Sequence, residues 1–195
     1  MSFLRAWLTG YYSPVQLIEQ LRSKPAPQWG IFAQFLRGVF DSLLVYLPVS
    51  LMGRVPPTPS FLSFVPTERY YAALIWMGPF VLLAEMLMGI VVIHVLLRLM
   101  GRHSDIDQII NIVGMSALIV GAVLIPWDWL WLALGGVDQY FLGISHLVIS
   151  LWATVIIGVG LQRILSVPLW LGIDLSVISI PVQLPIAMMF MRSPF

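Results

Sequence analysis

Long apolar segments alternate with short polar ones along this chain of 195 residues. Five of the apolar segments approach about 20 residues, the length with which an α-helix crosses a hydrocarbon core about 30 Å thick. The pattern predicts an all-α fold, a polytopic membrane helix bundle with five transmembrane helices. The spans lie near residues 31–52, 71–99, 108–125, 140–162 and 168–191. The last contains Pro181 and Pro185, and because proline lacks a backbone N–H we expect this span to be kinked or to end early.

The residues before the first span are more polar and form a separate predicted part. We interpret residues 1–30 as a cytoplasmic N-terminal segment and residues 31–195 as the transmembrane domain. Within the first part, "SPVQLIEQLRSKPAP" predicts one short helix, with Leu17, Ile18 and Leu21 on its apolar side. A helix with one apolar side is typical of an interfacial element, so we expect it to lie along the membrane surface.

The basic residues outside the spans predict the orientation of the chain. One side of the predicted topology holds Arg5, Arg22, Lys24, Arg98, Arg102 and Arg163, and the other holds Arg54, Arg69 and Arg192. Because loops rich in Lys and Arg stay in the cytoplasm, we expect a cytoplasmic N-terminus and a C-terminus outside. We expect a multi-pass protein of the cell inner (cytoplasmic) membrane, with the first span serving as its own insertion signal.

Composition supports the membrane interpretation and excludes several kinds of site. Only 10% of the residues are charged and 59% are hydrophobic, whereas soluble domains carry about 25% charged residues. The expected partner is therefore the lipid bilayer, and the formal net charge of +1 gives no argument for a nucleic-acid partner. The chain has no cysteine, which excludes disulfides and thiolate chemistry.

Charged side chains inside the first two predicted spans form the main candidate site. Gln34, Arg37, Gly38 and Asp41 share one helix face in "QFLRGVFD". Each charge would cost about 2.5–3.5 kcal/mol in lipid, so we expect this face to point into the bundle, with Glu85 of the second span as a third charged member. The predicted intramembrane polar cluster is thus Gln34, Arg37, Asp41 and Glu85. Three interpretations are open. The cluster is a set of polar contacts that holds two helices together (a polar lock), it is a proton or ion pathway, or it results from a misplaced span boundary.

The other polar motifs are weaker candidates. His103, Asp105 and Asp107 in "GRHSDIDQ" form a candidate ion-binding site, because imidazole and carboxylates suit divalent ions. The alternative is helix capping and solvation, since acidic residues favour the start of a helix. "GISH", Gly143 to His146, is discarded as a protease motif because Leu147 stands where a glycine is needed. With no nucleophile–base pair in the sequence, we expect no catalytic residues, no metal and no cofactor.

Small residues mark the expected helix contacts. Gly114, Ala117 and Gly121 lie along one face of the third span. Gly158 and Gly160 leave the fourth span without bulky side chains at their positions. Such positions allow close approach of backbones in a membrane. They favour a compact bundle.

Several of these stretches together resemble the prokaryotic branch of the Yip1 domain family. The stretches are "SPVQLIEQLRSKPAPQWGIF" before the first span, "WMGPFVLL" (Trp76 to Leu83) and "INIVGMSALIVGAVLIP" (Ile110 to Pro126), in a five-span layout with a cytoplasmic N-terminus. Trp76 and Met77 replace the acidic–leucine pair that precedes Gly-Pro in eukaryotic members, so a role that rests on that acid is not implied. Eukaryotic members are multi-span proteins of the early secretory pathway that interact with small GTPases and shape membranes.

Three functions remain open from the sequence. The first is a non-enzymatic, Yip1-like membrane protein that acts through association with itself, with other membrane proteins or with lipids. The alternative is a small oligomeric transporter or channel that uses the intramembrane Arg/Asp/Glu relay. Such a transporter would need a second copy, since five short spans leave little room for a pathway. The third is a subunit of a larger membrane complex.

Overall fold

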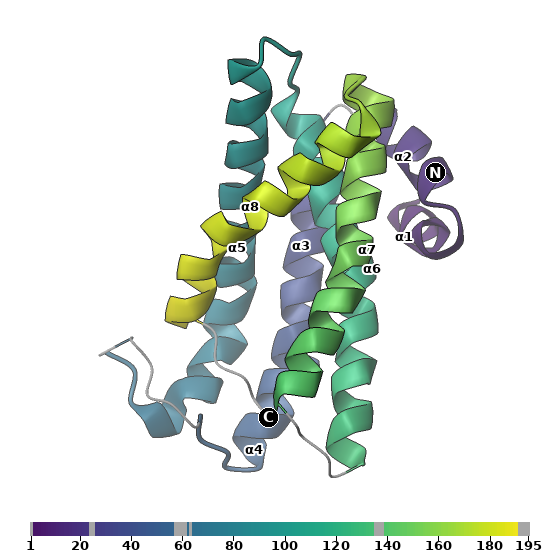
Figure 1. The fold of residues 1–195 in the computed structure, drawn as a ribbon. Helices are drawn as coiled ribbons and strands as arrows, with labels where there is room; N and C mark the ends of the chain where they lie inside the picture. Colours follow the sequence, from purple (N-terminus) through teal and green to yellow (C-terminus); the bar gives the residue numbers. More distant parts are fainter. Residues whose placement is uncertain (1, 24–25, 57–61, 63, 135–138, 191–195) are drawn as a thin grey trace.

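The structure is a computed structural model that describes residues 2–23, 26–56, 62, 64–134 and 139–190. It confirms the predicted all-α bundle, and no strand occurs in the described residues (Figure 1). In chain order the elements are α1 (Phe3–Tyr12), α2 (Pro14–Arg22), α3 (Gln28–Asp41), the π-helical turn η1 (Ser42–Tyr46), α4 (Leu47–Leu51), the 3₁₀ turn η2 (Thr67–Arg69), α5 (Tyr70–Leu99), α6 (Ile106–Ala133), α7 (Gln139–Leu165) and α8 (Leu169–Phe190).

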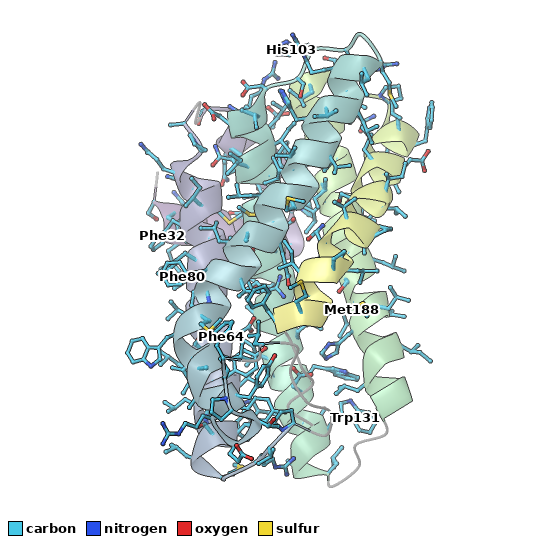
Figure 2. All side chains as sticks on the ribbon, turned by 90° about the vertical axis from the view of Figure 1, so that its left-hand side faces the viewer. Phe32, Phe64, Phe80, His103, Trp131 and Met188 are labelled. Carbon is cyan, nitrogen blue, oxygen red and sulfur yellow. The ribbon has the colours of Figure 1, made fainter. Side chains whose placement is uncertain are left out.

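Five helical segments are long and apolar enough to cross a membrane, as the sequence predicted. They are Gln28–Leu51, Thr67–Leu99, Ile106–Trp131, Phe141–Leu165 and Leu169–Phe190. The chain is therefore a multi-pass membrane protein. Its outward-facing side chains are large and apolar, as lipid contact requires: Trp76 is 78% exposed and Phe80 is 64% exposed (Figure 2).

Prolines end fewer helices than predicted. The third span does not stop near residue 125, because α6 continues through Pro126 to Ala133. The fifth span does not end early either, since α8 contains Pro181 and Pro185 and reaches Phe190. Residue 191, the predicted last residue, lies outside the described part. Helices in lipid tolerate proline because neighbouring helices and polar side chains satisfy the carbonyl groups that it leaves free.

Four helices run along the long axis of the bundle, and the fifth crosses them. α3, α5, α6 and α7 extend along the molecule, and α8 runs obliquely from the end of α7 across the front toward α5 (Figure 1). Accordingly, α8 packs on α5 and α7, while α3 packs on α5 and α6. Only 17% of the most apolar window of α8 is buried in the chain, so most of its surface faces outward.

Glycines bring α3 and α6 into backbone contact. A Cβ atom on Gly30 would overlap the Ile110 carbonyl, and a Cβ atom on Gly114 would overlap the backbone of Gly30. At the same crossing the Gly30 N–H donates to Oδ1 of Asn111 over 2.9 Å, and Nδ2 of Asn111 donates to the Ala26 carbonyl over 2.8 Å. Steric fit and a buried amide therefore fix the position of α3 on α6.

The other small residues also pack inside the chain. Gly38 of α3 lies against Pro79 of α5, where an added Cβ would come within 2.5 Å of the Pro79 Cα. Gly158 of α7 lies against Gly172 of α8, where a Cβ on Gly172 would lie 2.9 Å from the Gly158 carbonyl oxygen. The predicted helix contacts at Gly114 and Gly158 are thus confirmed, and they are contacts within one chain.

The N-terminal segment differs from the sequence-based expectation. It forms two helices, α1 and α2, where one was predicted. Leu17, Ile18 and Leu21, which were expected to face the membrane, are fully buried in the core of the bundle. The Tyr11 hydroxyl donates to the carbonyl of Ile119, well inside α6. The apolar side of α2 is therefore covered by the protein itself, because α6 and α7 offer it an apolar surface.

Candidate intramembrane polar site

The first span becomes irregular directly after the polar residues of α3. After Asp41 the helix changes to the π-helical turn η1, and α4 follows with Pro48 at its start. Pro48 cannot donate to the carbonyl of Leu44 four residues earlier, and Trp129 of α6 donates its indole N–H to that carbonyl over 2.7 Å. Such π-helical turns occur often at functional sites, and this one follows directly on Asp41.

Arg37 and Asp41 form an ion pair inside the bundle. Nε of Arg37 lies 3.8 Å from Oδ2 of Asp41, and the two side chains are 24% and 17% exposed. The stem of Arg37 passes over Gly121 of α6, where a Cβ would lie 2.8 Å from its Cγ and Cδ atoms. The predicted pairing is therefore present, and Gly121 provides the space for the arginine.

Gln34 and Glu85 occupy the same interior but make different contacts. Gln34 is 3% exposed and donates from Nε2 to the carbonyl of Leu82 in α5 over 2.7 Å. Glu85 is 9% exposed and interacts electrostatically with Arg37. Glu85 is thus near the α3 residues, as the sequence predicted, although it forms no ion pair with Arg37 within 4.0 Å among the described residues.

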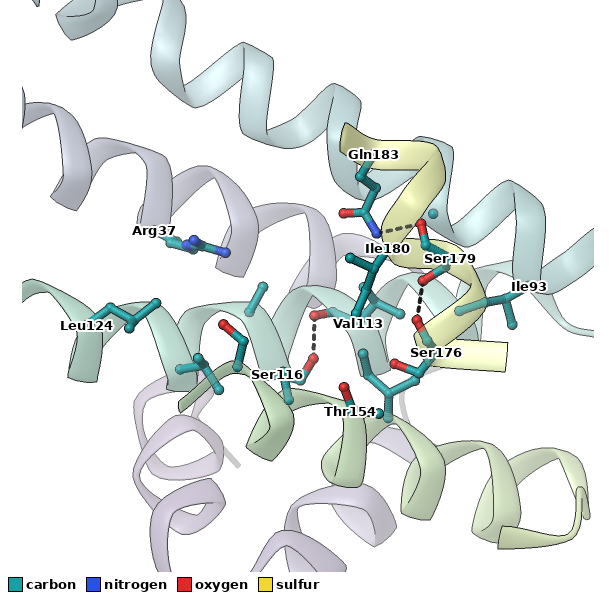
Figure 3. Close-up of a pocket in the computed structure, with 16 residues that line it drawn as sticks. Arg37, Ile93, Val113, Ser116, Leu124, Thr154, Ser176, Ser179, Ile180 and Gln183 are labelled. Atoms are coloured by element: carbon teal, nitrogen blue, oxygen red, sulfur yellow. Dashed lines mark hydrogen bonds between the residues drawn. The ribbon is translucent and has the colours of Figure 1, made fainter. Parts of the chain in front are cut away.

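Two cavities meet at Arg37. The serine cavity, of about 160 Å³, lies among the spans and is lined by polar groups of α6, α7 and α8 besides Arg37 (Figure 3). Those polar residues are Ser116, Ser150, Thr154, Ser176, Ser179 and Gln183. The histidine cavity, also about 160 Å³, is lined by Arg37, Asp41, Val45, Tyr46, Gly121, Leu124, Ile125, Asp128 and His146. Arg37 and Leu124 line both, so the arginine stands between the two cavities.

Asp128 and His146 are functional candidates that sequence reasoning missed. Nε2 of His146 in α7 lies 2.5 Å from Oδ1 of Asp128 in α6, and both side chains line the histidine cavity with Arg37 and Asp41. Asp128 sits among the tryptophans of "PWDWLW", which the sequence places at the membrane interface. The sequence held one signal for this pair. Consecutive spans are antiparallel, so Asp128 near the end of α6 and His146 near the start of α7 come to the same end of the bundle.

Several buried polar atoms near Arg37 lack hydrogen-bond partners. Among the described residues, Nε of Arg37, Oε1 of Gln34, Oγ of Ser42 and Oε1 of Glu85 make none. Buried polar atoms are almost always paired, and exceptions occur where groups serve binding or chemistry. The arrangement offers one guanidinium, three carboxylates and an imidazole that can exchange protons and hold a small charged solute.

The loop between α5 and α6 has a structural role. Oδ1 of Asp105 accepts hydrogen bonds from the N–H groups of Asp107 and Gln108, which caps the start of α6. His103 is exposed at the end of the bundle (Figure 2). Among the described residues no three His, Cys, Asp or Glu side chains are grouped so that they could hold a metal ion, and the capping role of Asp105 is the alternative considered from the sequence.

No family model, no curated protein and no solved structure matches this chain. The resemblance to the Yip1 domain family therefore stays a prediction from short motifs. What the fold establishes is a multi-pass helical membrane protein with a polar site between its spans.

Proposed function

We propose that this protein is a small transporter or channel whose working groups are Arg37, Asp41 and Glu85. The observation that carries the proposal is the position of Arg37, which lines both the serine cavity and the histidine cavity. Ionisable residues within membrane spans commonly mark solute pathways or proton relays. An arginine that lines two adjacent cavities is placed to bind or repel every charged solute that moves from one to the other.

The geometry favours a pathway over a polar lock. A buried ion pair stabilises a fold only where short hydrogen bonds compensate for the loss of water around both charges. Arg37 and Asp41 are 3.8 Å apart, and Nε of Arg37 and Oε1 of Glu85 have no hydrogen-bond partner among the described residues. These groups contribute less to stability than a well-bonded lock would, and they can change partners.

A single chain supplies the cavities. The lining residues of the serine cavity come from α3, α5, α6, α7 and α8 of one copy. A second copy, which the sequence-based argument required, is not needed to form this space.

Association, the function first expected from the sequence, has less support. That hypothesis came from the resemblance to the Yip1 family and from the lack of a catalytic constellation, with small-residue helix faces as added support. Gly30, Gly114, Gly158 and Gly172 are occupied by neighbouring helices of the same chain. The Yip1-like function remains a prediction without an observation in the structure that favours it.

Flux through reconstituted protein tests the proposal. The parent chain, Asp41→Asn and Glu85→Gln are purified, their melting temperatures are measured, and proton, potassium and organic-anion flux are recorded in liposomes. Asp174→Asn is the matched control, because Asp174 is an exposed carboxylate near the start of α8. We expect the parent and Asp174→Asn to conduct, and we expect Asp41→Asn and Glu85→Gln to lose flux while they melt normally.

Absence of flux of organic anions as well as of protons and potassium in every sample, the parent included, would overturn the transporter proposal. Lower melting temperatures of Asp41→Asn and Glu85→Gln in that same experiment would point to a polar lock.

We further propose that the N-terminus is cytoplasmic and that the protein resides in the inner membrane of its cell. The distribution of basic residues between the loops supports this orientation. Because the chain has no cysteine, Phe3→Cys and Phe195→Cys each introduce a unique thiol. An impermeant reagent applied to intact cells should label the second and not the first, and labelling of both would refute the five-span topology.

A further inference from the structure

The serine cavity has the size of a small organic molecule. Its volume of about 160 Å³ is close to that of an engineered protein cavity of about 150 Å³ that binds benzene, a molecule of about six heavy atoms. Most of its lining is apolar, contributed by residues such as Ile93, Val120, Leu124, Ile157 and Ile180. A bare inorganic ion would leave this apolar surface uncovered, so the space suits a solute with a short hydrocarbon part.

The polar groups of the cavity differ in what they offer a solute. Ser116 donates to the Val113 carbonyl and Ser179 to the Ser176 carbonyl, each over 2.7 Å, so their oxygens face the cavity as acceptors. Gln183 donates from Nε2 to the Ser179 carbonyl over 3.1 Å. Figure 3 shows these α8 residues at one side of the cavity and Arg37 at the other. The charged donor of the site is therefore the Arg37 guanidinium.

Arg37 has the geometry and the freedom to hold a carboxylate. A guanidinium matches the two oxygens of a carboxylate with parallel N–H bonds, which makes arginine the preferred residue for such ligands. The pair with Asp41 is long, at 3.8 Å, and Nε of Arg37 is not hydrogen-bonded within the described residues. A second carboxylate in the serine cavity can therefore approach Arg37 without first breaking a short hydrogen bond.

We propose that the serine cavity binds a short-chain monocarboxylate, with its carboxylate on Arg37 and its hydrocarbon chain among the apolar lining residues. The inference rests on the proposed function, because it names the class of solute that such a transporter would carry. Butyrate, with four carbons and two oxygens, matches the six heavy atoms estimated from the volume.

Several ionisable side chains surround Arg37 and affect how it binds an anion. They are Asp41 on α3, Tyr46 on η1, Glu85 on α5, Asp128 on α6 and His146 on α7. The ionised carboxylates oppose an incoming anion, and Asp41 competes with it for Arg37.

Binding of tritiated butyrate to the purified full-length protein tests the inference. The parent should bind butyrate saturably, and butyramide, its neutral isostere, should not compete. Arg37→Gln should lose about tenfold to hundredfold in affinity, as loss of a charge-assisted hydrogen bond predicts. Asp41→Asn should gain affinity because it removes the competing carboxylate, and this variant tests the idea even where Arg37→Gln fails to fold.

Thr154→Val and Thr9→Val form a matched pair for the cavity itself. Thr154 lines the cavity, whereas Thr9 donates to the Arg5 carbonyl in α1, away from it. Only Thr154→Val should weaken butyrate binding, by about twofold to tenfold.

Two results would overturn the inference. One is a parent protein without saturable butyrate binding, and the other is binding that Asp41→Asn and a folded Arg37→Gln leave unchanged. A protein that conducts protons or potassium but binds no butyrate overturns the monocarboxylate site alone. A protein that binds butyrate but shows no flux of protons, potassium or butyrate overturns the transport proposal alone.

Discussion

The crossing of α3 and α6 allows one substitution to be judged quantitatively, Gly114→Ala. A methyl group on Gly114 would overlap the carbonyl group and the Cα of Gly30. Because all of these atoms belong to the backbone, no change of rotamer can relieve the overlap. The two helices must move apart, and the hydrogen bond between Gly30 and Asn111 must lengthen with them.

The expected cost follows from two opposing terms. Inserting a methyl group into a packed interior costs about 1–3 kcal/mol, and backbone contact places this site near the upper value. Alanine favours a helix over glycine by about 1 kcal/mol, so the net loss of unfolding free energy is about 2 kcal/mol. For a chain of this size 1 kcal/mol corresponds to about 2–4 °C, which predicts a melting temperature lower by about 4–8 °C.

Gly143→Ala is the matched control, because it makes the same substitution in α7 with open space around it. No heavy atom of the described residues lies within 4 Å of a Cβ added there. The substitution then raises the unfolding free energy by about 0.5–1 kcal/mol, because no steric cost opposes the higher helix propensity of alanine. The melting temperature should rise by about 1–4 °C. Thermal unfolding of both variants in one detergent, followed by circular dichroism, makes the comparison. Melting of Gly114→Ala at or above the parent would refute the steric argument, as would an equal fall in both variants.

Three further substitutions probe hydrogen bonds. Asn111→Ala removes both bonds to the start of α3 and should cost about 1–3 kcal/mol, whereas the exposed Gln162→Ala should leave the melting temperature unchanged. Trp129→Phe leaves the Leu44 carbonyl without its indole donor and should cost about 1 kcal/mol in a denaturant titration. Burial raises the pKa of Tyr11 above its ordinary value of 10.0, so the unfolded chain loses that proton first. Because Tyr11→Phe also removes the hydrogen bond to the Ile119 carbonyl, it should melt below the parent at neutral pH. The difference should shrink as the pH rises above about 10, and a difference independent of pH would contradict this.

The parts of the structure that the sequence predicted are those fixed by local geometry. The thickness of a bilayer sets the length of a span, so the five spans could be recognised from apolar length alone. The interior placement of Gln34, Arg37 and Asp41 followed from helical periodicity and from the cost of charge in lipid. Neither prediction depends on which helices are neighbours in the bundle.

The parts that were missed depend on contacts between distant segments. Asp128 and His146 pair across the connection between α6 and α7, and their partnership depends on the register of two antiparallel helices. The continuation of α6 past Pro126 depends on neighbours that compensate for a lost hydrogen bond. Helix α1 was missed because so short a segment is marginal by itself and is stabilised by packing against the spans.

The packing of α1 and α2 on later helices has a consequence for the order in which the protein is assembled. Tyr11 bonds to Ile119, which leaves the ribosome 108 residues later, and α2 also contacts α7. At about 5–20 residues per second, synthesis of those 108 residues takes on the order of 5–20 s. During that interval α1 and α2 lack their partners on α6 and α7. Helices α1 and α2 are thus complete well before α6 and α7, and they can reach their native position only after those two spans have been made.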